Sequence, residues 1–206
     1  AGNCPPTHKH DSLNLFTNSG TIYVNGGNLA CSVLTMEHKG AINLAAATSM
    51  IISGGTHLIQ NGAVINGPGS ISVTGGIMNI QTDFTLSTAV LNLSGSPIIN
   101  GSNKLTIATG NTMNCAGGSI QGSNDLIIEA GANFNITNGF SIYDTKRLLN
   151  QGTCNWTGGN ISLQNTGTVI FQNEGTFNAN LSTNFNIQPV STGGNRKFIN
   201  TATGII

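Results

Sequence analysis

The sequence predicts an all-β protein folded as a parallel β-helix, or β-solenoid, with about 20–23 residues in each coil. Three observations favour this fold: a composition poor in charge, phrases that recur at a nearly fixed period, and short segments in which apolar and polar residues alternate. Only 7% of the 206 residues are Asp, Glu, Lys or Arg, compared with roughly 25% in typical globular domains. The apolar content of 38% is still enough to form a core.

The repeats set the period. INGSNKLTI (Ile99–Ile107) returns 21 residues later as IQGSNDLII (Ile120–Ile128), and LLNQGTCNW (Leu148–Trp156) returns after 23 as FQNEGTFNA (Phe171–Ala179). Self-similarity at a short, fixed period is typical of solenoids, in which each repeat packs only on its neighbours. Each unit contains short alternating segments separated by Gly, Asn or Ser-Gly turns, so we expect three strands per coil and coils stacked at ~4.8 Å.

An apolar–Asn–apolar tripeptide is the most regular feature. In a strand the two apolar side chains point to one side and the Asn to the other. We therefore expect a ladder of outward Asn side chains on one face, which serves either as hydrogen bonding between coils or as a polar platform for glycans. Ice binding would call for regular Thr-x-Thr, which is missing. The ladder consists of Asn92, Asn114, Asn135, Asn155 and Asn178.

A second phrase, apolar–x–Asn–x–Gly–Thr–apolar, occurs at Phe16–Ile22, Leu148–Cys154, Leu163–Val169 and Phe171–Phe177. We interpret it as a corner of the coil, with Asn and Gly chosen because both tolerate a positive φ. The copies are unequally spaced, so the phrase is expected to serve more than one corner.

The few charged residues do not suggest catalysis or nucleic-acid binding. The formal net charge is zero, and no basic patch is present to follow a phosphate backbone. Asp125 and Glu129 would share a strand face but lie ~13 Å apart, too far for a glycosidase pair. We expect Lys104 and Asp125, one coil apart, to form an exposed ion pair, and Asp144, Lys146 and Arg147 to form a solvated corner loop. No catalytic residue is predicted, and the protein is expected not to be an enzyme.

The cysteines and histidines give no clear metal or cofactor site, and none is predicted. Cys4 and Cys31 are the candidate disulfide pair in an exported protein, whereas Cys115, Cys154 and Trp156 fall on inward positions. The cluster from His8 to Asp11 could bind a metal but is more typical of a solvated terminus. His38 and His57 are isolated, and we expect them to be exposed. No apolar run reaches the length of a membrane span.

Tandem F-x-N-x-G-T-F phrases, with the looser copy FINTATGII (Phe198–Ile206), resemble those of bacterial surface adhesins built from β-strand repeats. These include filamentous-haemagglutinin-like exoproteins, autotransporter passengers and repeat adhesins of Bacteroidetes. The resemblance implies a right-handed β-helix, an extracellular or cell-surface location and a structural or adhesive role. Residues 1–12 do not match and are expected to be a leader or cap before a single solenoid domain, 13–206. Because the chain stops in mid-repeat, this domain is expected to belong to a longer array.

Three functions stay open at this point. The first is a non-enzymatic structural or adhesive segment of a bacterial surface protein, whose partners are other parts or copies of the solenoid and surface glycans. The second is a self-assembling fibre subunit joined through open solenoid ends. The third is a carbohydrate-binding or carbohydrate-active β-helix. Neither nucleic acid nor membrane insertion is expected for any of them.

Overall fold

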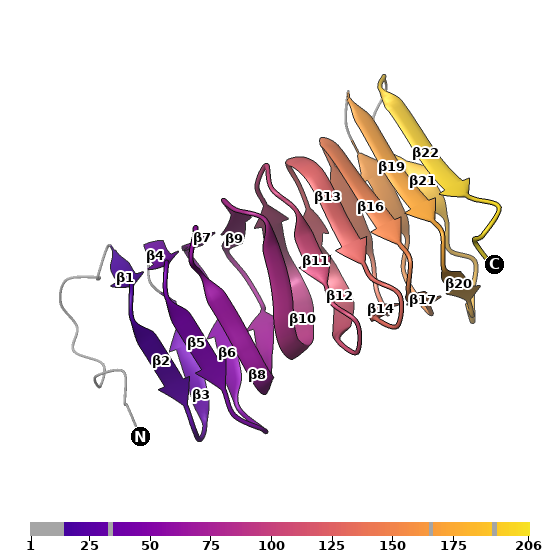
Figure 1. Cartoon of the computed structure of the whole chain (residues 1–206). Helices are drawn as coiled ribbons and strands as arrows, with labels where there is room; N and C mark the ends of the chain where they lie inside the picture. The colour runs from indigo at the N-terminus through magenta and orange to yellow at the C-terminus, as the bar shows by residue number, and fades with distance from the viewer. Residues whose placement is uncertain (1–14, 33–34, 165–166, 191–192) are drawn as a thin grey trace.

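The computed structural model describes residues 15–32, 35–164, 167–190 and 193–206. Within these ranges the protein is all-β, with no helix, and its strands β1 to β22 pair in parallel. The chain winds from the N-terminus to the C-terminus as a stack of coils, one strand row above the next (Figure 1). The predicted parallel β-solenoid is therefore confirmed. None of the described residues forms a helix long and apolar enough to cross a membrane.

Each coil contributes a strand to three parallel ladders. The long strands β8, β10 and β12 belong to more than one ladder because each continues through a corner. Ladder 1 holds β2 (Thr21–Val24), β5 (Ala41–Leu44), the start of β8 (Val64–Val73), the start of β10 (Phe84–Asn100), β11 (Leu105–Ile107), β13 (Ser123–Ile128), β16 (Thr145–Asn150), β19 (Thr168–Asn173) and β22 (Asn195–Asn200). Ladder 2 holds β3 (Asn28–Cys31), β6 (Ser49–Ile52), the end of β8, the middle of β10, the start of β12 (Thr112–Ile120), β14 (Asn133–Ile136), β17 (Thr153–Trp156) and β20 (Thr176–Ala179). Ladder 3 holds β1 (Phe16–Asn18), β4 (Thr35–His38), β7 (Thr56–Ile59), β9 (Ile77–Ile80), the ends of β10 and β12, β15 (Phe140–Tyr143), β18 (Ile161–Gln164) and β21 (Ile187–Pro189).

The register gives the length of each coil. Steps between paired residues are 20–23 throughout most of the stack, for example from Leu148 to Phe171, as the repeats predicted. The last coil departs from this period, because Phe171 pairs with Phe198 after 27 residues. The additional residues fall between ladders 3 and 1.

The core is a narrow column enclosed by the three ladders. Strand after strand alternates half-buried and buried residues, so the apolar side chains point inward and the polar ones outward. Aromatic rings fill the C-terminal part of the column: the Phe171 ring centroid lies 5.5 Å from that of Phe177 and 5.2 Å from that of Phe198. Trp156, Cys115 and Cys154 are buried, as predicted. Cys154 pairs in register with Phe134, whereas Cys115 pairs with Ile136, so the two thiols occupy different columns.

The repeated Asn–x–Gly phrase lies at two different corners, as its spacing predicted. Phe16–Ile22 joins ladder 3 to ladder 1, and so does Leu163–Val169, whose residues 165–166 lie outside the described ranges. Leu148–Cys154 and Phe171–Phe177 join ladder 1 to ladder 2. The predicted reason for the phrase is wrong, however: no described Asn has a positive φ, and the glycines of these phrases are not among the positive-φ residues.

The glycine of the phrase is needed because stacked corners touch. A Cβ on Gly175 would lie 2.2 Å from the carbonyl oxygen of Gly152, and one on Gly152 would lie 2.3 Å from that of Ala132. Contacts this short do not occur for real Cβ atoms, so any side chain here would push one coil away from the next. Gly20, by contrast, has no atom within 4 Å of the added Cβ position.

Candidate binding surfaces

The predicted Asn ladder exists on the outer face of ladder 2. Its members pair in register from Asn92 to Asn178. Each amide donates from Nδ2 to the Oδ1 of the Asn one coil nearer the N-terminus, at 2.9 Å from Asn114 to Asn92 and 2.8 Å from Asn135 to Asn114. Asn155 and Asn178 continue the chain, each at 2.9 Å. Four hydrogen bonds thus run in one direction along the rod.

Ladder hydrogen bonding leaves part of each amide for a ligand. An Asn side chain has two N–H donors and an oxygen with two lone pairs. An Asn within the ladder uses one donor and one lone pair on its neighbours, so one donor and one lone pair stay available at half-exposed positions. The face can therefore offer a repeating polar group, while its bonds between coils also serve stability.

A second Asn ladder lies inside the solenoid, and the sequence analysis missed it. Asn150 and Asn173 are buried at the corner between ladders 1 and 2, in register with Asn200. Asn150 donates to Asn173 Oδ1 and Asn173 donates to Asn200 Oδ1, both at 2.7 Å. Asn173 Nδ2 also lies 3.2 Å from the carbonyl oxygen of Gly175 and 3.1 Å from that of Ile205. These are the asparagines of the corner phrase, whose constant place in its copies was the available signal.

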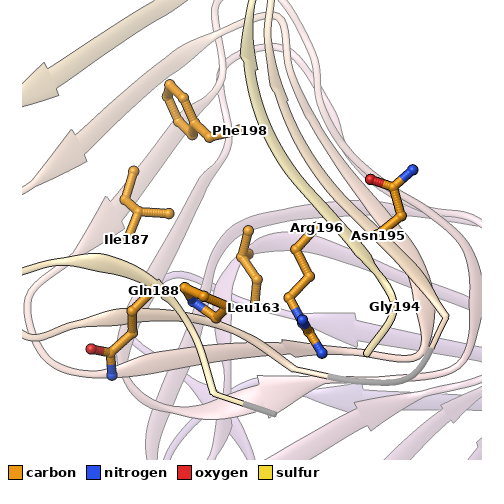
Figure 2. Close-up of a pocket in the computed structure, with 8 residues that line it drawn as sticks. Leu163, Ile187, Gln188, Gly194, Asn195, Arg196 and Phe198 are labelled. Atoms are coloured by element: carbon orange, nitrogen blue, oxygen red, sulfur yellow. The ribbon is translucent and has the colours of Figure 1, made fainter. Parts of the chain in front are cut away.

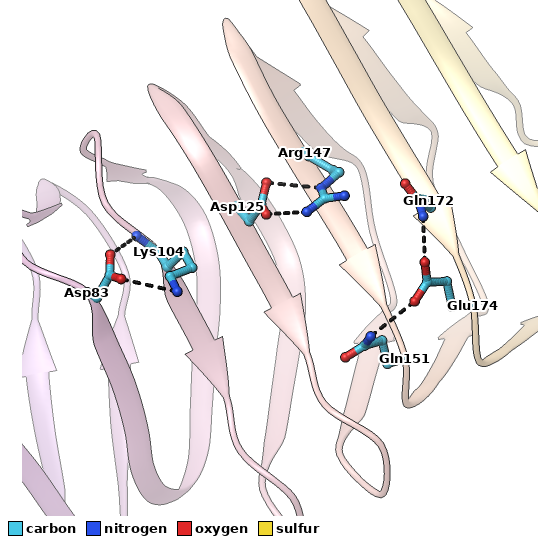
Figure 3. A network of polar contacts seen from close by, with 7 residues as sticks. All are labelled: Asp83, Lys104, Asp125, Arg147, Gln151, Gln172 and Glu174. Carbon is cyan, nitrogen blue, oxygen red and sulfur yellow. Dashed lines mark hydrogen bonds and ion pairs between the residues drawn. The ribbon is translucent and has the colours of Figure 1, made fainter.

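The charged side chains form a row on the outside of ladder 1 (Figure 3). Lys104 and Asp125 occupy equivalent positions, but the predicted ion pair between them is wrong. Lys104 Nζ lies 3.2 Å from Asp83, whose Oδ1 also accepts the Lys104 backbone N–H at 3.0 Å. Asp125 pairs with Arg147, which donates from both Nε and an Nη atom. The Lys104 backbone and side chain lower the pKa of Asp83, and the hydrogen bond to Asp125 raises that of Arg147.

The row separates the remaining charges rather than gathering them. Asp144 accepts the Gly122 N–H at 3.0 Å, while Arg147 faces Asp125 one coil back. Residues 145–147 belong to β16, so the predicted solvated corner loop is confined to Asp144. Glu129 accepts the Thr109 N–H at 3.2 Å, and Asp125 is held by Arg147, so these two carboxylates do not converge.

His38 and His57 are fully buried, so their predicted exposure is wrong. They stand on the inward side of ladder 3, with ring centroids 6.0 Å apart. His57 Nε2 lies 3.1 Å from the carbonyl oxygen of Gly54, whereas both ring nitrogens of His38 and Nδ1 of His57 have no hydrogen-bond partner. Burial, and secondarily the neighbouring His57, lowers the pKa of His38 to about 4; burial also lowers that of His57. Both rings are therefore neutral at pH 7.

The buried thiols offer no reactive site. Burial raises the pKa of both Cys115 and Cys154, and the thiolate is the nucleophilic form. Among the described residues no three His, Cys, Asp or Glu side chains gather as metal ligands. Cys4, and with it the predicted disulfide to Cys31, lies outside the described ranges, as does the cluster from His8 to Asp11.

A cavity of about 620 Å³ opens at the C-terminal end, inside the enlarged last coil (Figure 2). Leu163, Ile187 and Phe198 give it apolar walls, and Arg196 extends along it between Leu163 and Gly194. Nearby, Ile205 and Ile206 expose 63% and 71% of their surface. This end presents apolar surface that a further coil or a second molecule could cover.

Comparison with known protein families, with curated proteins and with solved structures finds no match for this chain. Its function is therefore argued from the surfaces described above.

Proposed function

We propose that this chain is a non-enzymatic structural and adhesive segment of an extracellular bacterial surface protein. The observation that carries the proposal is the unbroken stacking of three parallel ladders along the whole described length, reinforced by one Asn ladder outside and another inside. A rod of this kind keeps surface groups at fixed spacing, which suits a stalk that presents binding groups away from a cell.

The chemistry of the side chains supports a mechanical role. Outward positions carry neutral amides and hydroxyls that can pair with their own kind from coil to coil. Charges occur as oppositely charged neighbours, such as Asp83 with Lys104, and exposed pairs of this kind contribute little stability. Stability thus rests on the core and the ladders, which depend weakly on salt.

The alternative function is a fibre subunit that pairs through the end of the solenoid. The apolar surface of Ile205 and Ile206 and the cavity beneath Phe198 favour it. Open strand edges can template pairing with another chain. A second copy of the chain is the partner that such pairing would require.

Electron microscopy of negatively stained particles across a concentration series tests the two functions. Short rods of constant length support the stalk segment, whereas filaments that lengthen with concentration replace it with the fibre subunit. Ile206→Asp at the end should abolish any lengthening, while Tyr23→Asp on the side of the rod should not. Compact particles without rod shape would contradict both.

A further inference from the structure

We propose that a groove over the corner between ladders 2 and 3 binds a neutral saccharide. This inference deepens the proposed adhesive role and rests on it. The groove has a volume of about 500 Å³ and crosses three successive coils. Its lining includes Gly95, Gly118, Gln121, Asn138, Ser141 and Tyr143.

Glycine forms the floor of the groove for a steric reason. Gly117 and Gly118 have φ values of 140° and 87°, which side-chain-bearing residues rarely adopt. A Cβ on Gly117 would also lie 2.4 Å from the carbonyl oxygen of Gly95. Because no side chain fits there, the corner is sunk below the neighbouring strands and a ligand can approach the backbone.

Polar side chains from ladder 3 form one wall. Gln121 Nε2 donates to Ser119 Oγ at 3.0 Å, and Ser141 Oγ accepts from Gln164 at 3.1 Å. These bonds fix the two amides while leaving Gln121 a second N–H and its carbonyl oxygen. The Ser141 hydroxyl also keeps its own hydrogen to donate.

Tyr143 supplies the aromatic surface of the groove. It is half-exposed at the end of β15, one coil beyond Gln121 in register. The next residue, Asp144, has a φ of 64° and accepts the Gly122 N–H at 3.0 Å. Residues held in such sparsely populated conformations often accompany functional sites, and this one fixes the chain directly after the Tyr143 ring.

The lining indicates the class of ligand. It contains no Asp, Glu, Lys, Arg or His, so a charged ligand would find no counter-ion. An aromatic ring, amides and hydroxyls in one concavity match a sugar ring, which has an apolar C–H face and a rim of hydroxyls. The outward Asn ladder lacks this combination, because its amides bond to one another on a flat face.

The test is titration of the purified chain with neutral oligosaccharides, followed by NMR and started from cellobiose, maltose, lactose and diacetylchitobiose. Wild-type protein should bind at least one of them. Tyr143→Ala should weaken that binding at least tenfold, and Tyr143→Phe should retain it within about threefold because stacking needs the ring rather than the hydroxyl. Tyr23→Ala, the chain's other tyrosine and fully outside the groove, should change nothing.

Several results would overturn the inference: no binding of any neutral saccharide, binding of anionic oligosaccharides alone, or binding that survives Tyr143→Ala. If binding survives there but falls in Asn135→Ala, the ligand lies on the Asn ladder; the adhesive role then stands and the groove does not. Rod shape in the microscope is independent of all these outcomes. Circular dichroism of each variant confirms that the solenoid is intact.

Discussion

The two ends of the solenoid bury polar side chains in different ways. Near the C-terminus, Asn150 and Asn173 stack on each other and on Asn200, so each amide meets an amide one coil away. Near the N-terminus, His38 pairs in register with Ile59, and His57 pairs with Met36. Three of the four ring nitrogens consequently have no partner. A solenoid accommodates a buried polar group when the next coil repeats it, because the register then supplies its partner.

Replacing Asn173 by Leu should give the largest effect. The change removes two interactions with neighbouring amides and strands the donor of Asn150 in the core. Unsatisfied buried groups cost about 1–3 kcal/mol each, so we expect a loss of about 4 kcal/mol in the free energy of unfolding. Urea titration measures it. A loss below about 1 kcal/mol would show that the interior ladder is not stabilising.

Acidification should destabilise the N-terminal end. The pKa of His38 falls from its ordinary value to about 4 in the folded chain, so the unfolded chain binds the proton more tightly. Stability is therefore full above pH ~6.5 and falls as pH drops toward 4, by on the order of 3 kcal/mol. Unfolding in urea at pH 7 and pH 4.5 checks this.

His38→Ile is the matched control for that pH dependence. The variant extends the column of Ile59 below it and removes two unpartnered nitrogens. We expect unchanged or slightly higher stability at pH 7 and a much flatter profile toward pH 4.5. An equally steep fall in the variant would assign the acid sensitivity to other groups.

The corner glycines provide a comparison between two copies of one phrase. Gly175→Ala places a methyl group against the backbone of Gly152 and should cost about 1–3 kcal/mol. Gly20→Ala has open space and should be neutral or slightly stabilising. Thermal unfolding of both variants measures the difference. Equal effects would mean that stacking does not dictate the glycine.

The outward Asn ladder should contribute least to stability. Asn135→Ala breaks two hydrogen bonds, to Asn114 and from Asn155, but water can replace them at this half-exposed position. We expect a loss within about 1 kcal/mol. A loss as large as that of Asn173→Leu would show that exposure does not distinguish the two ladders.

Periodicity along the chain was sufficient to predict much of the structure. The repeats gave the coil length, and strand alternation correctly placed Trp156, Cys115 and Cys154 inside and the Asn ladder outside. Applied to β4, the same alternation would have placed Met36 and His38 on one inward face. The exposure expected for His38 instead followed its polarity, and the core overrode it.

The sequence by itself thus determined the architecture, because period and alternation are properties of a linear pattern that stacking turns directly into register. The tertiary structure alone decided which neighbours bond. Lys104 has an acid one coil away on each side, and side-chain reach paired it with Asp83. Likewise, the glycines at stacked corners are explained by contacts between backbones about 20 residues apart, and the groove beside Tyr143 exists only where three such corners meet.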